Sequence, residues 1–177
     1  VLEVQPNSLL ILDSLHLTGG YNPEGGGGIL AREALSLILN RCTISDCSTT
    51  NRGGGILFDK GDSLKLVEST LSGSTAMQGG GIYFNGKTIS LENCTFTGNS
   101  AAGEFSPAGG AIFHRSGQMA IQHSTVVNNS ASGNSSMKSI TAVFGLASTC
   151  CSDCASINAS RPEPRKTTYP RLPSLVR

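Results

Sequence analysis

A glycine-rich tetrapeptide recurs along the chain, and this repeat restricts the possible folds more than any other feature of the sequence. Each copy has two or three glycines and ends in isoleucine. The four copies are Gly26-Gly27-Gly28-Ile29, Gly53-Gly54-Gly55-Ile56, Gly79-Gly80-Gly81-Ile82 and Gly109-Gly110-Ala111-Ile112. Successive isoleucines are 27, 26 and 30 residues apart. A near-constant spacing of this length is typical of solenoid proteins, in which each repeat forms one turn of the structure.

A second motif follows each glycine cluster at a steady offset, and a partial copy near the start of the chain brings the visible units to five. The copies cover residues 15–20, 42–47, 69–74, 94–99 and 124–129. Apolar residues between the two motifs alternate with other residues, as in Leu37/Leu39 and Leu64/Leu66. A period of two residues indicates strands with one buried face.

A single unit of short strands and tight turns cannot bury its own apolar face, but stacked units share a continuous core. We therefore predict an all-β solenoid of about five coils, with equivalent positions of successive coils about 4.8 Å apart. Two inner columns are expected, one of Leu17, Ile44, Leu71, Phe96 and Val126 and one of Ile29, Ile56, Ile82 and Ile112. We expect the glycines at corners with positive φ or where stacked chains approach too closely for a Cβ.

The composition limits which residues can form the core, and the charge distribution limits which partners the chain can bind. Aromatic residues make up 5% of the chain, charged residues make up 14%, and there is no Trp, so the core must be mainly aliphatic. Residues 1–132 carry 7 Lys or Arg against 10 Asp or Glu, whereas residues 133–177 carry 6 against 2. The repeats therefore lack the basic stripe that binding to nucleic acid requires. No apolar run approaches the length of a membrane span, so we expect membrane association only through an anchor that this chain lacks.

At these motifs the sequence resembles the repeats of the chlamydial polymorphic outer-membrane proteins, which carry a GGAI-type and an FxxN tetrapeptide in each coil. Gly109-Gly110-Ala111-Ile112 matches the first fully and Phe96-Thr97-Gly98-Asn99 matches the second fully, whereas Val126-Val127-Asn128-Asn129 keeps only the Asn. The resemblance covers roughly residues 9–132 and extends to other bacterial and protist surface proteins with such repeats. It implies a right-handed parallel β-helix that serves as the passenger of an autotransporter, a surface adhesin.

We accordingly expect a non-enzymatic module, secreted or at the cell surface in an outer membrane, that binds a host cell, a neighbouring cell or glycans. The longest insertion between coils lies between Asn99 and Gly109. Its residues Glu104, Phe105, Ser106 and Pro107 are the predicted contact site, because functional contacts concentrate on loops. The alternative is that Phe105 folds back onto the coil.

An enzymatic alternative is a fragment of a pectin lyase-like protein, such as a pectate lyase or polygalacturonase, whose active coils lie outside this segment. Such enzymes need several acidic residues on adjacent coils. Asp59 and Asp62 are candidates, but Asn85 and Gly86 stand at their places in the next unit. We therefore interpret the two aspartates as solvated turn residues and predict no catalytic residue.

No metal or cofactor is expected either. No Asp or Glu lies between Gly109 and Ser132, where two of the three histidines occur, so His16, His114 and His123 are interpreted as surface or turn residues. The CxxC motif of Cys150, Cys151 and Cys154 lacks further zinc ligands.

Cys42 and Cys94 share one predicted column, and their positions two coils apart put their backbones about 9–10 Å from each other. That separation is too long for a disulfide, so buried thiols are expected. The chain is predicted to divide into repeats over residues 1–132 and an irregular, basic, Pro- and Ser-rich tail over 133–177. The segment from Ile140 to Leu146 could add one capping strand.

Overall fold

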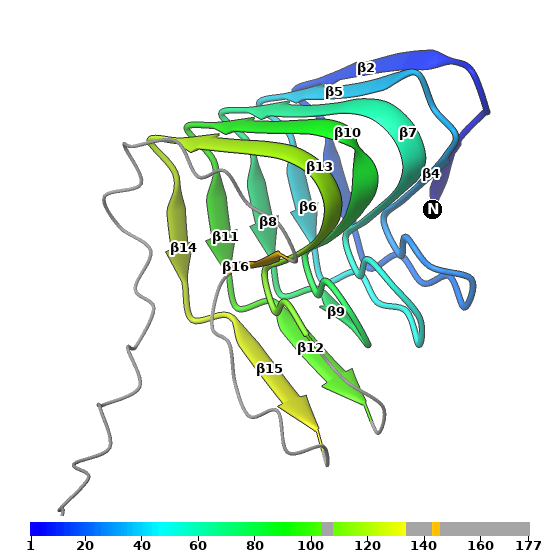
Figure 1. The fold of residues 1–177 in the computed structure, drawn as a ribbon. Helices are drawn as coiled ribbons and strands as arrows, with labels where there is room; N and C mark the ends of the chain where they lie inside the picture. The colour runs from blue at the N-terminus through cyan, green and yellow to red at the C-terminus, as the bar shows by residue number, and fades with distance from the viewer. Residues whose placement is uncertain (104–107, 134–142, 146–177) are drawn as a thin grey trace, which may run out of the picture.

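The chain winds into stacked coils whose strands form three parallel sheets (Figure 1). The computed structural model describes residues 1–103, 108–133 and 143–145. Coils 1 to 5 begin at Leu2, Ile29, Ile56, Ile82 and Ile112. Each strand pairs with its counterpart one coil away, and every pairing is parallel. The predicted all-β fold of about five coils is thus confirmed.

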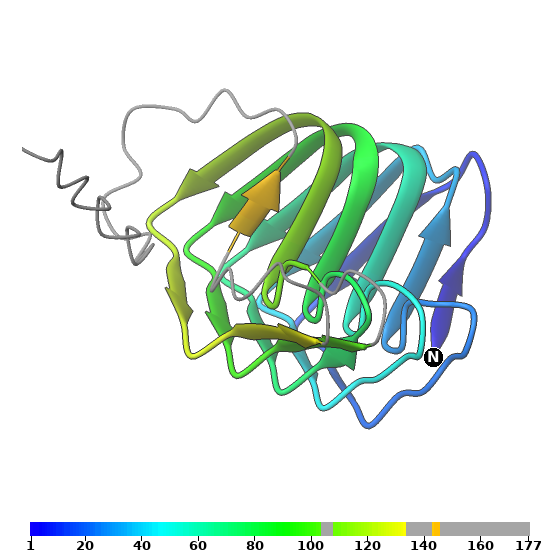
Figure 2. The ribbon, with the colours of Figure 1, turned by 60° about the horizontal axis from the view of Figure 1, so that its bottom comes forward.

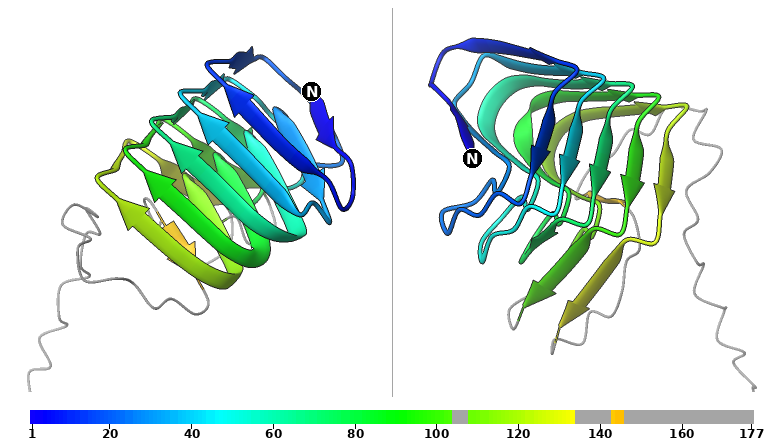
Figure 3. Two further views of the ribbon diagram at one scale, coloured as in Figure 1. Left: turned by 90° about the horizontal axis from the view of Figure 1, so that it is seen from above. Right: turned by 180° about the vertical axis from the view of Figure 1, so that it is seen from behind.

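The long sheet contains the first strands of every coil. Its strands are β1 (Leu2–Val4), β2 (Leu9–Asp13), β4 (Ile29–Arg32), β5 (Ser36–Asn40), β7 (Ile56–Val67), β10 (Ile82–Glu92), β13 (Ile112–Gln122) and β16 (Val143–Gly145). The second sheet contains β3 (His16–Thr18), β6 (Thr43–Ser45), β8 (Thr70–Ser72), β11 (Thr95–Thr97) and β14 (Thr125–Val127). The third contains β9 (Thr75–Ala76), β12 (Ser100–Gly103) and β15 (Ser130–Gly133). Figures 2 and 3 show the three sheets as separate walls of one tube.

The long strands of coils 3 to 5 differ from the prediction of short strands joined by turns. β7, β10 and β13 run for 12, 11 and 11 residues and bend without a break. Gly61 lies at the bend of β7, where a Cβ would overlap the ring of Phe58, and Gly86 has the same relation to Phe58 and Phe84. Glycine therefore lets the strand curve around a large inner side chain.

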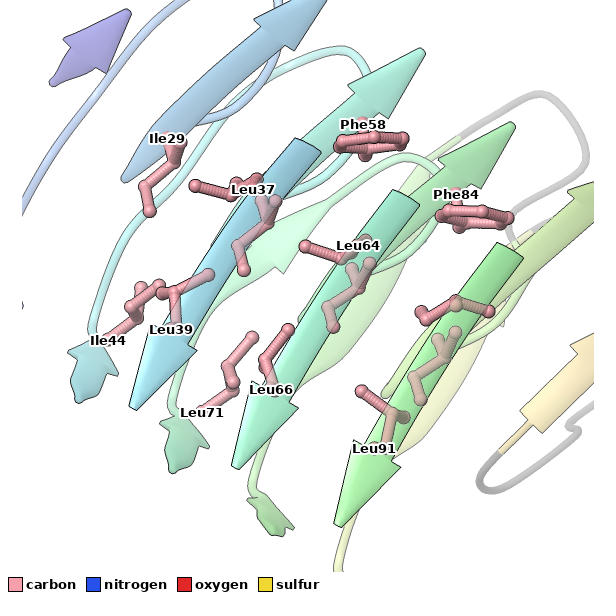
Figure 4. Close-up of a cluster of buried hydrophobic side chains, with 14 of the residues drawn as sticks. Ile29, Leu37, Leu39, Ile44, Phe58, Leu64, Leu66, Leu71, Phe84 and Leu91 are labelled. Atoms are coloured by element: carbon pink, nitrogen blue, oxygen red, sulfur yellow. The ribbon is translucent and has the colours of Figure 1, made fainter. Parts of the chain in front are cut away.

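The interior contains the two predicted columns in register. Ile29, Ile56, Ile82 and Ile112 are paired in sequence along the long sheet, as are Leu17, Ile44, Leu71, Phe96 and Val126 along the second sheet. Except for the half-buried Leu17, all are buried. Figure 4 shows buried leucines and phenylalanines of successive coils stacked above one another. Phe58 and Phe84 stack with ring centroids 5.4 Å apart.

The glycine clusters have both of the predicted roles. The first glycine of each cluster has positive φ, with 63° at Gly26, 66° at Gly53 and Gly79, and 69° at Gly109. The second glycine meets the next coil, since a Cβ on Gly54 would lie 2.7 Å from the backbone nitrogen of Thr75. Only glycine fits both positions without moving backbone.

Two polar ladders border the second sheet, one at each end of its strands. At the start, the backbone N–H of Cys42 donates to Ser69 Oγ, and that of Cys94 donates to Ser124 Oγ. At the end, the Ser74 N–H donates to Asn99 Oδ1, and Asn99 Nδ2 donates to Leu71 O and to Asn129 Oδ1, each over 2.9–3.1 Å. These side chains satisfy buried backbone groups where the chain turns.

β16 pairs with β13 in the same parallel register, with Val143 opposite Ile112. The long sheet thus extends one strand beyond coil 5. The boundary between residues 132 and 133 stays a prediction, and most of the predicted tail lies outside the described residues.

Candidate functional site

The predicted contact loop, Glu104, Phe105, Ser106 and Pro107, lies outside the described residues. Its neighbours are placed. Gly103 ends β12, and Ala108 forms a parallel bridge with Gln78. Ala108 also packs against an outer apolar cluster made of Leu30, Leu57, Tyr83 and Phe113. The described coil therefore ends at Gly103 in the third sheet and resumes at Ala108 beside the outer apolar cluster.

A row of polar side chains crosses the outer surface of the long sheet at the bend. This polar row consists of Asp59, Asn85 and Ser116, which are register partners on β7, β10 and β13. Asn85 Nδ2 donates to Asp59 Oδ1 over 2.6 Å, and Ser116 Oγ donates to Asn85 Oδ1 over 2.7 Å. The row therefore links three coils by hydrogen bonds outside the core.

The interpretation of Asp59 and Asp62 as turn residues is wrong in its structural part, because both lie within β7, which continues through the bend. The expected match of Asp59 with Asn85 holds, but Gly86 stands opposite Gly61. Asp62 instead pairs with Lys87, with 2.8 Å between carboxylate oxygen and Nζ. Each carboxylate thus contacts a side chain of the next coil.

Arg115 projects from a β-bulge beside the polar row. His114 pairs with Phe84 and Ser116 pairs with Asn85, so Arg115 has no opposite residue on β10. Its Nη1 contacts the hydroxyl oxygen of Tyr83 at 3.3 Å, and this bond raises the pKa of the guanidinium. Bulges commonly redirect a side chain at a functional surface. Here the bulge places an exposed cation next to Asn85 and Ser116.

Tyr83 is covered on one side by a second guanidinium. The Cζ of Arg52 lies 5.2 Å from the centroid of the Tyr83 ring, and Phe113 stacks on that ring at 5.4 Å. Among the described residues, neither Arg52 nor Arg115 has an ion-pair partner, in contrast to Arg32 with Glu24. Two cations therefore converge on one tyrosine next to the polar row.

Sequence reasoning missed Tyr83, Arg52 and Arg115, and residue spacing carries no signal for the bulge. Ile82 precedes Ile89 by seven residues, and Ile112 precedes Met119 by the same number. Arg115 is an extra residue in β13, but β10 has an extra residue a few positions later, because Asn85 to Thr88 of β10 faces Ser116 to Gln118 of β13. The two insertions cancel in the residue count.

The expectation of surface or turn histidines is wrong for His114. Its side chain is 0% exposed, and its ring stacks on that of Phe84 with centroids 5.6 Å apart. Neither ring nitrogen has a hydrogen-bond partner in the described part of the chain. Desolvation by burial lowers the pKa of His114. His16 and His123 are exposed as expected, and His123 stands at a corner with φ 48°.

Cys42 and Cys94 behave as predicted. Cys42, Cys47 and Cys94 are buried and free, and burial raises the pKa of Cys47 and Cys94. Cys150, Cys151 and Cys154 lie outside the described residues. No group of three His, Cys, Asp or Glu that could hold a metal occurs within residues 1–103, 108–133 and 143–145. The same ranges contain no helix long and apolar enough to cross a membrane.

The comparisons with known proteins agree with the stacked parallel coils. Residues 4–155 match the family described as right handed beta helix region. Curated proteins and solved structures give no match. Since the matched residues include every strand from β2 to β16, the chain belongs to the family of right-handed β-helix regions.

Proposed function

We propose that this chain is a non-enzymatic binding module displayed outside the cell, in the manner of the chlamydial passengers that its repeats resemble. Its contact surface is the outer face of the long sheet at the bend, and its ligands are glycans on a host or neighbouring cell. The observation that carries this proposal is the polar row of Asp59, Asn85 and Ser116 with Arg115 beside it.

The chemistry of this surface suits sugar hydroxyls, which both donate and accept hydrogen bonds. The polar row offers a carboxylate, an amide and a hydroxyl group, and Arg115 adds N–H donors. Arg115 and Ser116 are exposed, whereas Asp59 and Asn85 are half-buried. The hydrogen bonds within the row hold these groups in place before a ligand arrives, which lowers the entropic cost of binding.

The same contacts favour binding over hydrolysis. Acid–base cleavage of a glycosidic bond uses a pair of carboxyl groups on either side of that bond. Asp59 accepts a hydrogen bond from Asn85, and Asp62 forms an ion pair with Lys87. Both carboxylates are therefore already engaged by neighbouring side chains. A screen for turnover of polyuronides, with and without calcium, tests this part of the proposal. Turnover would contradict it.

Binding to a panel of immobilised glycans tests the contact surface. We expect Asn85→Ala to weaken binding at least tenfold, because it breaks both hydrogen bonds of the row. Lys65→Ala is the matched control, since Lys65 is exposed on the same sheet away from the bend. Unchanged binding by the Asn85 variant, or no glycan binding by the intact chain, would refute the assignment.

The insertion at 104–107 remains a second part of the predicted contact surface. Its role is best tested by replacing Glu104, Phe105, Ser106 and Pro107 with Gly and Ser. A longer deletion that reached Ser100 would remove β12 and with it part of the third sheet. Loss of binding to cells in the loop variant, with an unchanged midpoint of urea unfolding, would support the loop as a contact.

A further inference from the structure

The second sheet carries an ordered array of hydroxyl groups on its outer face. Each of its five strands has one inward residue between two outward ones, and among the outward residues only Ser45 is buried, with its Oγ donating to Thr18 Oγ1 over 3.0 Å. One outward column is His16, Thr43, Thr70, Thr95 and Thr125, and the other is Thr18, Ser45, Ser72, Thr97 and Val127. Eight of these ten residues are Thr or Ser, and we call them the hydroxyl array.

The array repeats in two directions. Register partners on neighbouring strands lie about 4.8 Å apart, and the two outward residues of one strand lie about 6.6 Å apart. The pairing contains no register shift from β3 to β14. Figures 1 and 3 show these strands side by side in one row with little twist between neighbours. The face is therefore flat and regular.

The polar ladders hold this spacing fixed. The Cys42–Ser69 and Cys94–Ser124 bonds join the coils just before the array, and the Ser74–Asn99–Asn129 bonds join them just after it. Every coil also turns into this sheet through a left-handed residue, namely Ser14, Arg41, Glu68, Asn93 or His123. The hydroxyl groups thus sit on a rigid frame.

The character of the array points to a neutral, periodic partner. None of the ten outward positions is acidic, and none is Lys or Arg. Thr side chains offer a methyl group beside each hydroxyl, so the face is both hydrogen-bonding and weakly apolar. No Phe, Tyr or Trp occurs at these positions, although the apolar faces of sugar rings commonly pack on such side chains. Sheet-like polysaccharides are therefore the poorer fit.

We propose that the hydroxyl array binds the surface of ice. A prism face of hexagonal ice repeats in two directions at spacings close to the two spacings of the array, so array hydroxyls can take the places of lattice water. The methyl groups fill the spaces between them. This binding uses the second sheet and is independent of the proposed glycan surface on the long sheet.

The test is the gap between the freezing and melting temperatures of a solution of the full chain, together with retention of the protein in growing ice. We expect a measurable gap for the native sequence and loss of most of it in Thr70→Lys, which inserts a charge at the centre of the array. Ser63→Lys, an outward position of the long sheet in the same coil, should keep the gap. Thr95→Lys provides a second disruption if Thr70→Lys does not fold.

Three outcomes would overturn the proposal. One is a native gap no larger than that of an inert protein at equal concentration. Another is an equal gap in the Thr70 and Thr95 variants when circular dichroism shows them folded. The third is binding to microcrystalline cellulose or chitin that depends on Thr70 while ice is not bound, which would assign the array to a polysaccharide.

Discussion

Arg115 reaches back one coil and donates a hydrogen bond from Nη1 to the hydroxyl oxygen of Tyr83, over 3.3 Å. The contact joins an exposed bulge residue to a tyrosine that is 1% exposed. It lies between the polar row, which we assign to ligand contact, and the outer apolar cluster, which is part of the packing. Variants of Tyr83 can separate the contribution of its hydroxyl group from that of its ring.

Tyr83→Phe should leave the free energy of unfolding almost unchanged, because the lost hydrogen bond is made by an exposed cation and the ring still stacks on Phe113. Tyr83→Ala should lower it by about 3–5 kcal/mol, the usual cost of removing a buried aromatic ring. Urea unfolding followed by circular dichroism measures both. Equal effects of the two variants would show that the hydroxyl, rather than the ring, provides the stability.

Asn99→Ala should be among the most destabilising single changes in the second sheet. The side chain is fully buried, accepts from the Ser74 N–H and donates to Leu71 O and Asn129 Oδ1. Its removal leaves buried polar groups without partners, at a cost of at least about 2 kcal/mol. Thr97→Ala, an outward change in the same coil, is the control. A smaller loss for Asn99→Ala than for Thr97→Ala in urea unfolding would contradict the ladder's role.

The glycines should divide into two classes. Gly98 has φ 65°, and the nearest atom to an added Cβ is 3.8 Å away, so Gly98→Ala meets only backbone strain of about 1–2 kcal/mol. Gly54→Ala places its Cβ 2.7 Å from the Thr75 nitrogen and against Gly80 O, both of the next coil. We therefore expect a several-fold larger loss for Gly54→Ala in thermal and urea unfolding. Similar losses would mean that the coils can move apart.

Stability should fall on mild acidification because of His114. Burial lowers its pKa in the folded state, so below an unfolded pKa of about 6.5 the unfolded chain binds more protons. The stabilising contribution of neutral His114 is thus complete above that pH and is lost as the pH falls through the folded pKa. His114→Phe should flatten the dependence between pH 7.5 and 5.5 while stacking on Phe84 is kept.

The control for this pH dependence is His123→Gln, which changes an exposed corner histidine. It should leave the slope of unfolding free energy against pH as in the native sequence. If the slope survives His114→Phe and disappears in His123→Gln, the buried ring is not its source.

The inner columns could be predicted from the sequence because a stacked coil requires similar residues at equal intervals. Ile29, Ile56 and Ile82 follow that requirement, and their register matches the prediction. His114 could have been placed in the same way, since it follows Ile112 by two residues, as Phe84 follows Ile82 and Phe58 follows Ile56. A comparison of equivalent positions, rather than of charged neighbours, would have revealed it.

The candidate surface was harder to predict than the core. Asp59 and Asn85 could be aligned by counting residues, but the bend that carries them resembles a turn in sequence. The Arg115 bulge changes the pairing without changing the length of the strand. The contact of Arg52 with Tyr83 joins the segment before β7 to β10, and such contacts leave no period in the sequence.

The corner residues with positive φ separate the inside of each coil from its outside. Glu68, Asn93 and His123 turn the backbone before these strands, and in each strand the central residue, Leu71, Phe96 or Val126, is buried while its two neighbours are not. A descendant of this gene can therefore exchange Thr70 or Thr95 while Leu71 and Phe96 stay the same. Selection on what the surface touches and selection on folding then act on different codons, and duplication of one coil supplies new surface without a new core.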